Sequence, residues 1–170
     1  MEAITYRRFL ALALPAGLSV LLINTFRMVD QFAVQWLGVP AQAAVGSCGF
    51  VLSAVMALFA LVSVGASVLV ARTTGAGDNE ERRKVVGGAL LAATLLTLLV
   101  LGALSLITPQ LVAVIGLRGA AAQEAISYLR WLCASGLFIG LAPTVDAAFI
   151  GMGRTGAMLW LQLIANAINV

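Results

Sequence analysis

The chain has 170 residues, of which 62% are apolar and only 10% are charged, and its formal net charge is +3. An average soluble domain has about 45–50% apolar and about 25% charged residues, whereas the mean hydropathy here is +1.05. A small soluble domain buries only about 70% of its chain surface, too little to hide so much apolar side chain. The composition therefore excludes an ordinary soluble fold and predicts an integral membrane protein.

Catalytic chemistry has few candidate residues in this sequence. The chain contains no histidine, which excludes Ser-His triads and histidine metal sites. Cys48 and Cys133 lie in separate apolar segments at a spacing unlike any zinc or redox motif, so we expect two buried, small apolar side chains. With no nucleophile–base pair and no metal cluster in view, the sequence predicts neither an enzyme nor a bound cofactor.

Five apolar segments follow one another along the chain. A membrane-spanning helix needs about 20 mainly apolar residues. The first segment is closed by Gly38 and Pro40, and the third by Thr108 and Pro109. The predicted membrane helices cover residues 9–37, 43–71, 85–107, 126–150 and 157–170. They indicate an all-α polytopic bundle, and because the fifth segment is still apolar at the last residue, we expect the N-terminal part of a longer protein.

Positive charges lie mainly on one side of the predicted bundle. With the N-terminus inside, the inner loops and helix ends carry Arg7, Arg8, Arg72, Arg82, Arg83, Lys84 and Arg154. The outer side carries only Arg118 and Arg130. Because cytoplasmic loops of membrane proteins are enriched in lysine and arginine, we predict a multi-pass protein of the cytoplasmic (inner) membrane with a cytoplasmic N-terminus.

Two local patterns predict turns and packing. The glycine-rich turn before Asp78 lacks the Gly-Lys-Ser/Thr of a phosphate-binding loop. We expect Asp78 or Asn79 to cap the following helix, with acidic residues in its positively polarised first turn. Gly136 and Gly140 form a GxxxG pair in the fourth helix. Such pairs let helices approach closely, and we expect this one to pack within the chain.

The first helix carries polar residues where lipid cannot satisfy them. They are Asn24, Arg27, Asp30, Gln31 and Gln35. At 100° per residue all five share an arc of about 140°. An ionisable group near the bilayer centre costs about 2.5–3.5 kcal/mol on insertion scales. We therefore expect the stripe to line a water-filled cavity or to face polar partners.

Two further helices carry polar residues at helical spacing. Those of the fifth helix are Gln162, Asn166 and Asn169. Those of the fourth helix are Tyr128, Ser135 and Asp146. Pro143, three residues before Asp146, is expected to kink the fourth helix and to free backbone carbonyls. Together, the patterns suggest that several helices turn polar faces toward one interior.

These polar residues have two interpretations. They can hold helices together through interhelical hydrogen bonds. Alternatively, carboxyl groups such as those of Asp30 and Asp146 can serve a proton or cation relay, the usual role of an acid inside a membrane bundle. Arg27, one turn before Asp30, can also pair with that carboxylate and give it a structural role.

Several segments, taken in order, resemble multidrug and toxic compound extrusion (MATE) transporters. The matching segments are 12–16, 28–30, 36–38, 71–77 and 151–155, followed by Asn166 and Asn169. The resemblance implies a secondary antiporter of twelve helices in two six-helix lobes, of which this chain would be most of the first lobe. It also implies export of amphiphilic, often cationic compounds in exchange for H⁺ or Na⁺. The implied partners are the lipid bilayer, the small-molecule substrate and the remaining helices, with no nucleic acid.

The resemblance also implies a cation site. Asp30 matches the acid of the first helix that contributes to a cation site in the N-terminal lobe of that family. Asp146 and Asn169 occupy positions of supporting amides, and Asp146 departs from the amide. Asp30 lies about 31 Å along its helix from Phe9, whereas Asp146 lies only about 13 Å from Thr155. Helix tilt, a bend at Pro15 and helix ends outside the membrane can close part of this difference, so the sequence does not decide whether the two carboxyl groups share one site.

Two other functions stay open on the sequence. A flippase for lipid-linked oligosaccharides belongs to the related superfamily, but its cavity would need several cationic residues, and Arg27 is one. A membrane scaffold without transport would use the polar stripes only for helix packing. The sequence does not choose between a proton and a sodium ion as the coupling ion.

Overall fold

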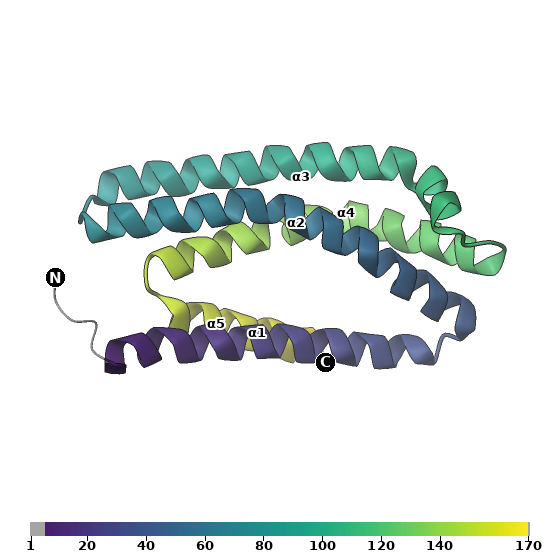
Figure 1. Ribbon diagram of the computed structural model, residues 1–170, viewed down its shortest axis with the longest axis horizontal. Helices are drawn as coiled ribbons and strands as arrows, with labels where there is room; N and C mark the ends of the chain where they lie inside the picture. The colour runs from purple at the N-terminus through teal and green to yellow at the C-terminus, as the bar shows by residue number, and fades with distance from the viewer. Residues whose placement is uncertain (1–5, 170) are drawn as a thin grey trace.

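The computed structural model describes residues 6–169, which form five α-helices joined by short turns (Figure 1). The helices are α1 (Tyr6–Gln35), α2 (Val39–Gly75), α3 (Asn79–Ile115), α4 (Ala120–Gly151) and α5 (Thr155–Asn169). The first four are long and apolar enough to cross a membrane. This confirms the predicted all-α membrane bundle. Inside the helices, the side chains outside the described part are those of Arg7, Arg8, Asp30, Asn166, Ile168 and Asn169.

The helices are longer than the apolar segments that predicted them. α2 and α3 have 37 residues each, or about 55 Å at 1.5 Å per residue, against about 30 Å for the hydrocarbon core. Arg72 and Lys84 lie between the predicted membrane segments 43–71 and 85–107, yet both residues are helical, Arg72 at the end of α2 and Lys84 near the start of α3. Hydropathy marks only the part of a helix that lipid surrounds, because helix ends can continue into water.

The predicted end of the third helix at Thr108 and Pro109 is wrong, because α3 continues to Ile115 with Pro109 inside it. Proline removes one backbone hydrogen bond and usually kinks or ends a helix. Here the last turns are held by packing, since Val112 is buried against α2 and α4. Figure 1 shows α3 turning toward those helices at this end. Tertiary contacts thus outweigh the proline.

The helix starts follow the chemistry of their first residues. Gly38 precedes α2 with φ of 90°, a conformation that glycine adopts readily, and Pro40 follows in the first turn. Asp78 caps α3, because its side chain accepts a 2.9 Å hydrogen bond from the backbone N–H of Glu81. This confirms the predicted cap. In the same first turns, Lys84 pairs with Glu80 over 2.9 Å.

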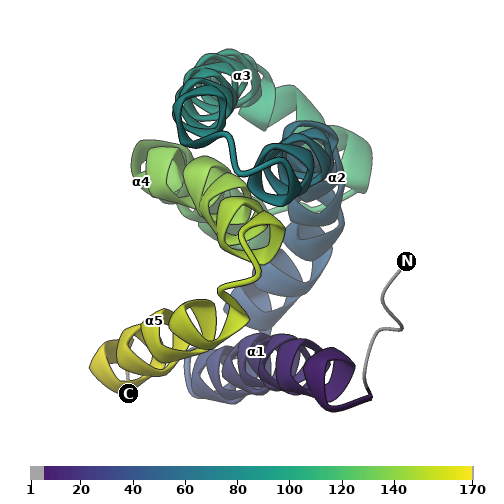
Figure 2. The ribbon, with the colours of Figure 1, turned by 90° about the vertical axis from the view of Figure 1, so that its left-hand side faces the viewer.

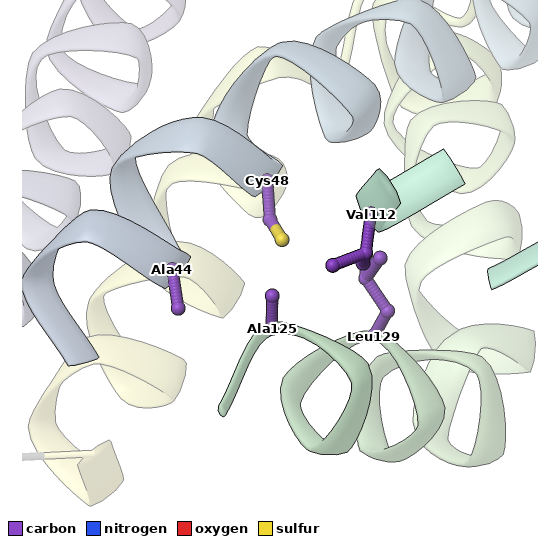
Figure 3. Packing of buried hydrophobic residues seen from close by; sticks show 5 residues of the cluster. All are labelled: Ala44, Cys48, Val112, Ala125 and Leu129. Atoms are coloured by element: carbon purple, nitrogen blue, oxygen red, sulfur yellow. The ribbon is translucent and has the colours of Figure 1, made fainter. Parts of the chain in front are cut away.

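The core lies between α2, α3 and α4. Figure 3 shows one cluster, in which Cys48 of α2 points toward Val112 of α3 and Ala125 of α4. A second cluster sets Val55 and Phe59 of α2 against the middle of α3. Cys48 is fully buried, as expected, whereas Cys133 is only half-buried.

The predicted GxxxG contact packs within the chain. A side chain at Gly136 would collide with Leu101 of α3, and one at Gly140 would collide with Thr97 of α3. The absence of side chains at these two glycines is what lets α4 approach α3 so closely. This contact fixes α4, the helix that carries Asp146.

α1 and α5 form a separate pair beside this three-helix bundle (Figure 2). The two helices pack against each other, and both run from the end of the molecule where α4 turns into α5 (Figure 1). At that end the α4–α5 turn lies against α1, since a side chain at Gly153 would meet Leu12 at 3.9 Å.

Candidate functional site

The polar stripe of α1 lines a shallow cavity. Four of the predicted cavity residues, together with Met28 and Phe32, lie along an open space of about 430 Å³ that is lined by α1 alone. The four are Asn24, Arg27, Gln31 and Gln35. Their side chains are exposed in the described part of the chain. The side chain of Asp30, predicted on the same arc, lies outside the described residues.

A second cavity joins this stripe to the three-helix bundle. It has a volume of about 530 Å³ and lies between α1, α2 and α4. Arg27 and Gln31 line it from α1, and Tyr128 lines it from α4. The polar stripe therefore borders two neighbouring cavities and faces other helices over part of its length. We refer to these two spaces together as the α1 cleft.

The wall that α2 contributes to the α1 cleft was not predicted as part of the site. It includes Gly46, Gly49 and Ser53, and a side chain added at either glycine would meet no atom within 4 Å. The hydroxyl of Ser53 donates a 2.9 Å hydrogen bond to the carbonyl oxygen of Gly49. The sequence signal for this wall is the spacing of three small residues along one face of the helix. The same spacing is also typical of helices that pack closely together, so it does not by itself indicate a cavity.

Asp146 makes a polar contact between two helices of this region. The side-chain amide of Gln162 in α5 donates to a carboxyl oxygen of Asp146 in α4 over 3.3 Å. Asp146 is half-buried and lies three residues after Pro143, which is inside α4. The structure thus brings together two predicted residues from different helices.

The three polar residues of α4 have different surroundings. Tyr128 faces the α1 cleft, and Asp146 contacts α5. Ser135 donates its hydroxyl hydrogen to the backbone carbonyl oxygen of Trp131, 3.0 Å away in its own helix. The regular spacing along α4 therefore does not produce one continuous polar surface.

Backbone positions separate the three predicted cation ligands into two depths. From the level where Leu12 and Gly153 meet, Asp30 is 18 residues along α1, about 27 Å, and Asn169 is 16 residues along α5, about 24 Å. Asp146 lies only seven residues from Gly153, about 10 Å. The backbones of Asp30 and Asn169 thus lie at similar distances from the level of the α4–α5 turn, whereas the backbone of Asp146 lies much nearer that turn. The side chains of Asp30, Asn166 and Asn169 are outside the described part.

The described residues contain no group of three or more histidine, cysteine, aspartate or glutamate side chains that could hold a metal ion. What the cleft offers instead is one positive charge, from Arg27, and several hydrogen-bonding groups within an otherwise apolar bundle. Such a surface is unfavourable against lipid, because lipid cannot satisfy polar groups. A polar cavity of this kind is typical of membrane proteins that move solutes.

Comparison with known families agrees with this arrangement. The model of the MatE family matches residues 15–170, which is most of the chain. The chain belongs to the MatE family. The matched region contains the whole polar stripe of α1, the α1 cleft and the Asp146–Gln162 contact.

Solved transporters share the fold. A multidrug resistance MATE family transporter of the MOP superfamily, in an outward-facing conformation, has a TM-score of 0.88 and 25% sequence identity. A MOP superfamily transporter from Pyrococcus furiosus, described by the reverse polarity of its binding pocket, gives the same two values. A MATE in a bent conformation has a TM-score of 0.86 at 25% identity. The match covers 95% of this MatE chain and 36% of each transporter, so the chain spans about a third of their length.

Proposed function

We propose that this MatE chain forms part of an ion-coupled antiporter that exports amphiphilic compounds across the cytoplasmic membrane, with its N-terminus in the cytoplasm. The observation that supports this function best is the α1 cleft, in which Arg27 and Gln31 of α1 face Tyr128 of α4 and the small residues of α2. Polar groups inside an apolar bundle are expensive, and in membrane proteins they usually mark a substrate or ion pathway. An amphiphilic compound can place its polar part on this stripe and its apolar part on the surrounding helices.

Asp30 is our candidate for the coupling-ion site. It lies on the polar arc of α1, one turn from Arg27, and its backbone is at about the same depth as that of Asn169 in α5. A carboxyl group there can bind H⁺ or Na⁺, and an amide can add an oxygen ligand. Coupling then requires that the ion and the substrate prefer different access states of the transporter.

Asp146 is proposed as a second carboxyl group at a different depth. Its contact with Gln162 joins α4 to α5, so a change in its protonation or ion occupancy would alter the contact between these helices. In this role Asp146 would control how firmly α5 is held against α4, and it would not need to lie beside Asp30.

A lipid-linked oligosaccharide flippase is less well supported. Its substrate carries phosphate groups, which several cationic side chains would have to neutralise. Arg27 is the one cationic side chain among the described residues that line the α1 cleft. Export of smaller amphiphilic compounds needs no such cluster.

The function can be tested with the variant Asp30→Asn in the complete transporter, reconstituted into proteoliposomes. We expect ethidium efflux driven by an imposed pH or Na⁺ gradient to fall to the level of protein-free liposomes, because an amide keeps the shape of the side chain but cannot become a carboxylate. Asp78→Asn is the matched control, since this aspartate caps α3 outside the cleft. Its efflux should stay near that of the unmodified protein.

The two gradients are applied separately, so the experiment also identifies the coupling ion. Gradient-driven efflux by Asp30→Asn at the normal rate would exclude the proposed ion site. Absence of efflux by the unmodified protein under either gradient, with ethidium and with a neutral amphiphile, would contradict the proposed transport function itself.

A further inference from the structure

A groove of about 660 Å³ lies between α3 and α4, apart from the α1 cleft. On α4 its wall begins at Arg130, two residues after Tyr128, which faces the cleft. Two residues correspond to about 200° around a helix, so the groove and the cleft lie on opposite sides of α4. The groove therefore belongs to a different surface from the proposed transport site.

The groove has a polar end and an apolar end. Ser105 lies ten residues before the end of α3 at Ile115, and Arg130 lies ten residues after the start of α4 at Ala120. Both are therefore about 15 Å from the turn that joins the two helices. The deeper part of the groove is lined mainly by Leu98, Leu101, Gly102 and Leu137, and Thr97 is the polar residue of this part.

The polar end lies near the boundary between hydrocarbon and headgroups. α4 has 32 residues, or about 48 Å, so about 9 Å extends beyond a 30 Å hydrocarbon core at each end if the helix is centred. Arg130 then starts about 6 Å inside this core, a depth from which an arginine side chain can extend to the headgroups. Its neighbour Trp131 is 77% exposed, and tryptophan is enriched at this level in membrane proteins.

Arg130 is available to an external anion. No carboxylate among the described residues forms an ion pair with it; the ion pair found in the described part of the chain joins Lys84 and Glu80 at the start of α3. A guanidinium group can form two parallel hydrogen bonds with a phosphate group. The surrounding apolar surface offers Arg130 no such acceptor, so a phosphate group from outside the protein fits it well. Ser105 is exposed across the groove at the same depth and can donate one more hydrogen bond.

We propose that this groove binds an anionic phospholipid of the leaflet at the α3–α4 end of the bundle. The lipid phosphate lies on the guanidinium group of Arg130 and the hydroxyl group of Ser105. One acyl chain follows the groove past Gly102 and contacts Leu98 and Leu137. The charge and the apolar wall occur in the order in which a phospholipid presents its headgroup and its chain from the interface inward.

The test is native mass spectrometry of the complete protein, titrated with dioleoyl phosphatidylglycerol after delipidation. We expect Arg130→Gln to weaken the tightest bound lipid about tenfold, because a hydrogen bond to a charged group is lost. Gly102→Leu should weaken the same lipid by filling the groove, and it leaves Arg130 in place. A Cβ atom at Gly102 would meet no atom within 4 Å, so the leucine side chain starts in open space and we expect this variant to fold.

Arg118→Gln is the matched control, because Arg118 is exposed in the α3–α4 turn and does not line the groove. Its affinity for phosphatidylglycerol should change less than twofold. Unchanged binding by Arg130→Gln would overturn the proposal. Equal losses in Arg118→Gln and Arg130→Gln, with normal binding by Gly102→Leu, would overturn it as well, since they would indicate general attraction to positive charge. Neither outcome depends on whether the protein exports ethidium.

Discussion

The α2–α3–α4 bundle and the α1–α5 pair are packed in different ways. In the bundle, each helix contributes at least five buried residues, and glycines allow the backbones of α3 and α4 to approach closely. In the pair, the buried residues among the described side chains are Ser19 of α1 and Thr155 and Met158 of α5. Lipid is as apolar as a protein core, so close packing, rather than the hydrophobic effect, holds membrane helices together. The bundle therefore carries most of the stability of this part of the protein.

The polar groups are distributed in the opposite way. The stripe of α1 borders the α1 cleft, whereas the bundle interior is mainly apolar. A transporter needs elements that can exchange between two arrangements around its binding site. Loosely packed helices change their arrangement at lower cost than closely packed ones. The difference suggests a stable frame of three helices and a more adaptable pair that carries the candidate ion site.

The largest effect on stability is expected from Gly151→Ala at the end of α4. The added carbon would lie 2.7 Å from the backbone oxygen of Ser67 and 2.9 Å from the Cβ atom of Val70, both in α2. Because a backbone atom cannot move aside easily, we expect a loss of about 2 kcal/mol or more. Thermal unfolding of the complete protein in detergent, followed by circular dichroism, would measure it.

Gly156→Ala provides the matched control in the α1–α5 pair. A side chain at Gly156 would meet no atom within 4 Å, so we expect a change within about 0.5 kcal/mol. Equal destabilisation by the two variants would mean that the pair is packed as closely as the bundle, and the comparison would fail.

A smaller effect is expected where the bundle begins its third helix. Asp78→Ala removes the acceptor of the backbone N–H of Glu81, and the loss of such a cap costs about 1 kcal/mol. Asp78→Ser should retain most of the stability, because serine is also a good capping residue. The same unfolding measurement applies, and an alanine variant as stable as the serine variant would show that this cap is not needed in the complete protein.

The fold was largely predictable because its signal is repeated over many residues. Apolar segments predicted five helices in the right order, and Asp78 predicted the start of α3. The end of α3 was not predictable, because the turns after Pro109 are held by contacts with distant residues such as Cys48 and Leu129. A sequence pattern reports local preference, whereas these contacts depend on how α2 and α4 pack.

The sequence predicted polar residues on α1, α4 and α5, and those of α1 could be followed furthest. Helical geometry predicted one periodic stripe there, and four of its residues, among them Asn24 and Gln35, lie along the α1 cleft, while their role in transport stays a prediction. The α2 wall was missed, because Gly46 and Gly49 line the cleft by leaving space rather than by supplying a polar group. The role of Asp30 stays a prediction.

The smallest effect is expected at the contact that joins the two regions, between Asp146 of the bundle and Gln162 of the pair. A double-mutant cycle with Asp146→Ala and Gln162→Ala should give a coupling free energy of about 0.6 kcal/mol, the average for hydrogen bonds between membrane helices. The contact is long, at 3.3 Å, and the unfolded helices in a membrane also find polar partners. Unfolding of the complete protein in bicelles would measure the coupling. A coupling free energy near 2 kcal/mol would show that α5 is held firmly against the three-helix bundle. The α1–α5 pair would then not be free to rearrange, and the proposed difference between the two regions would be wrong.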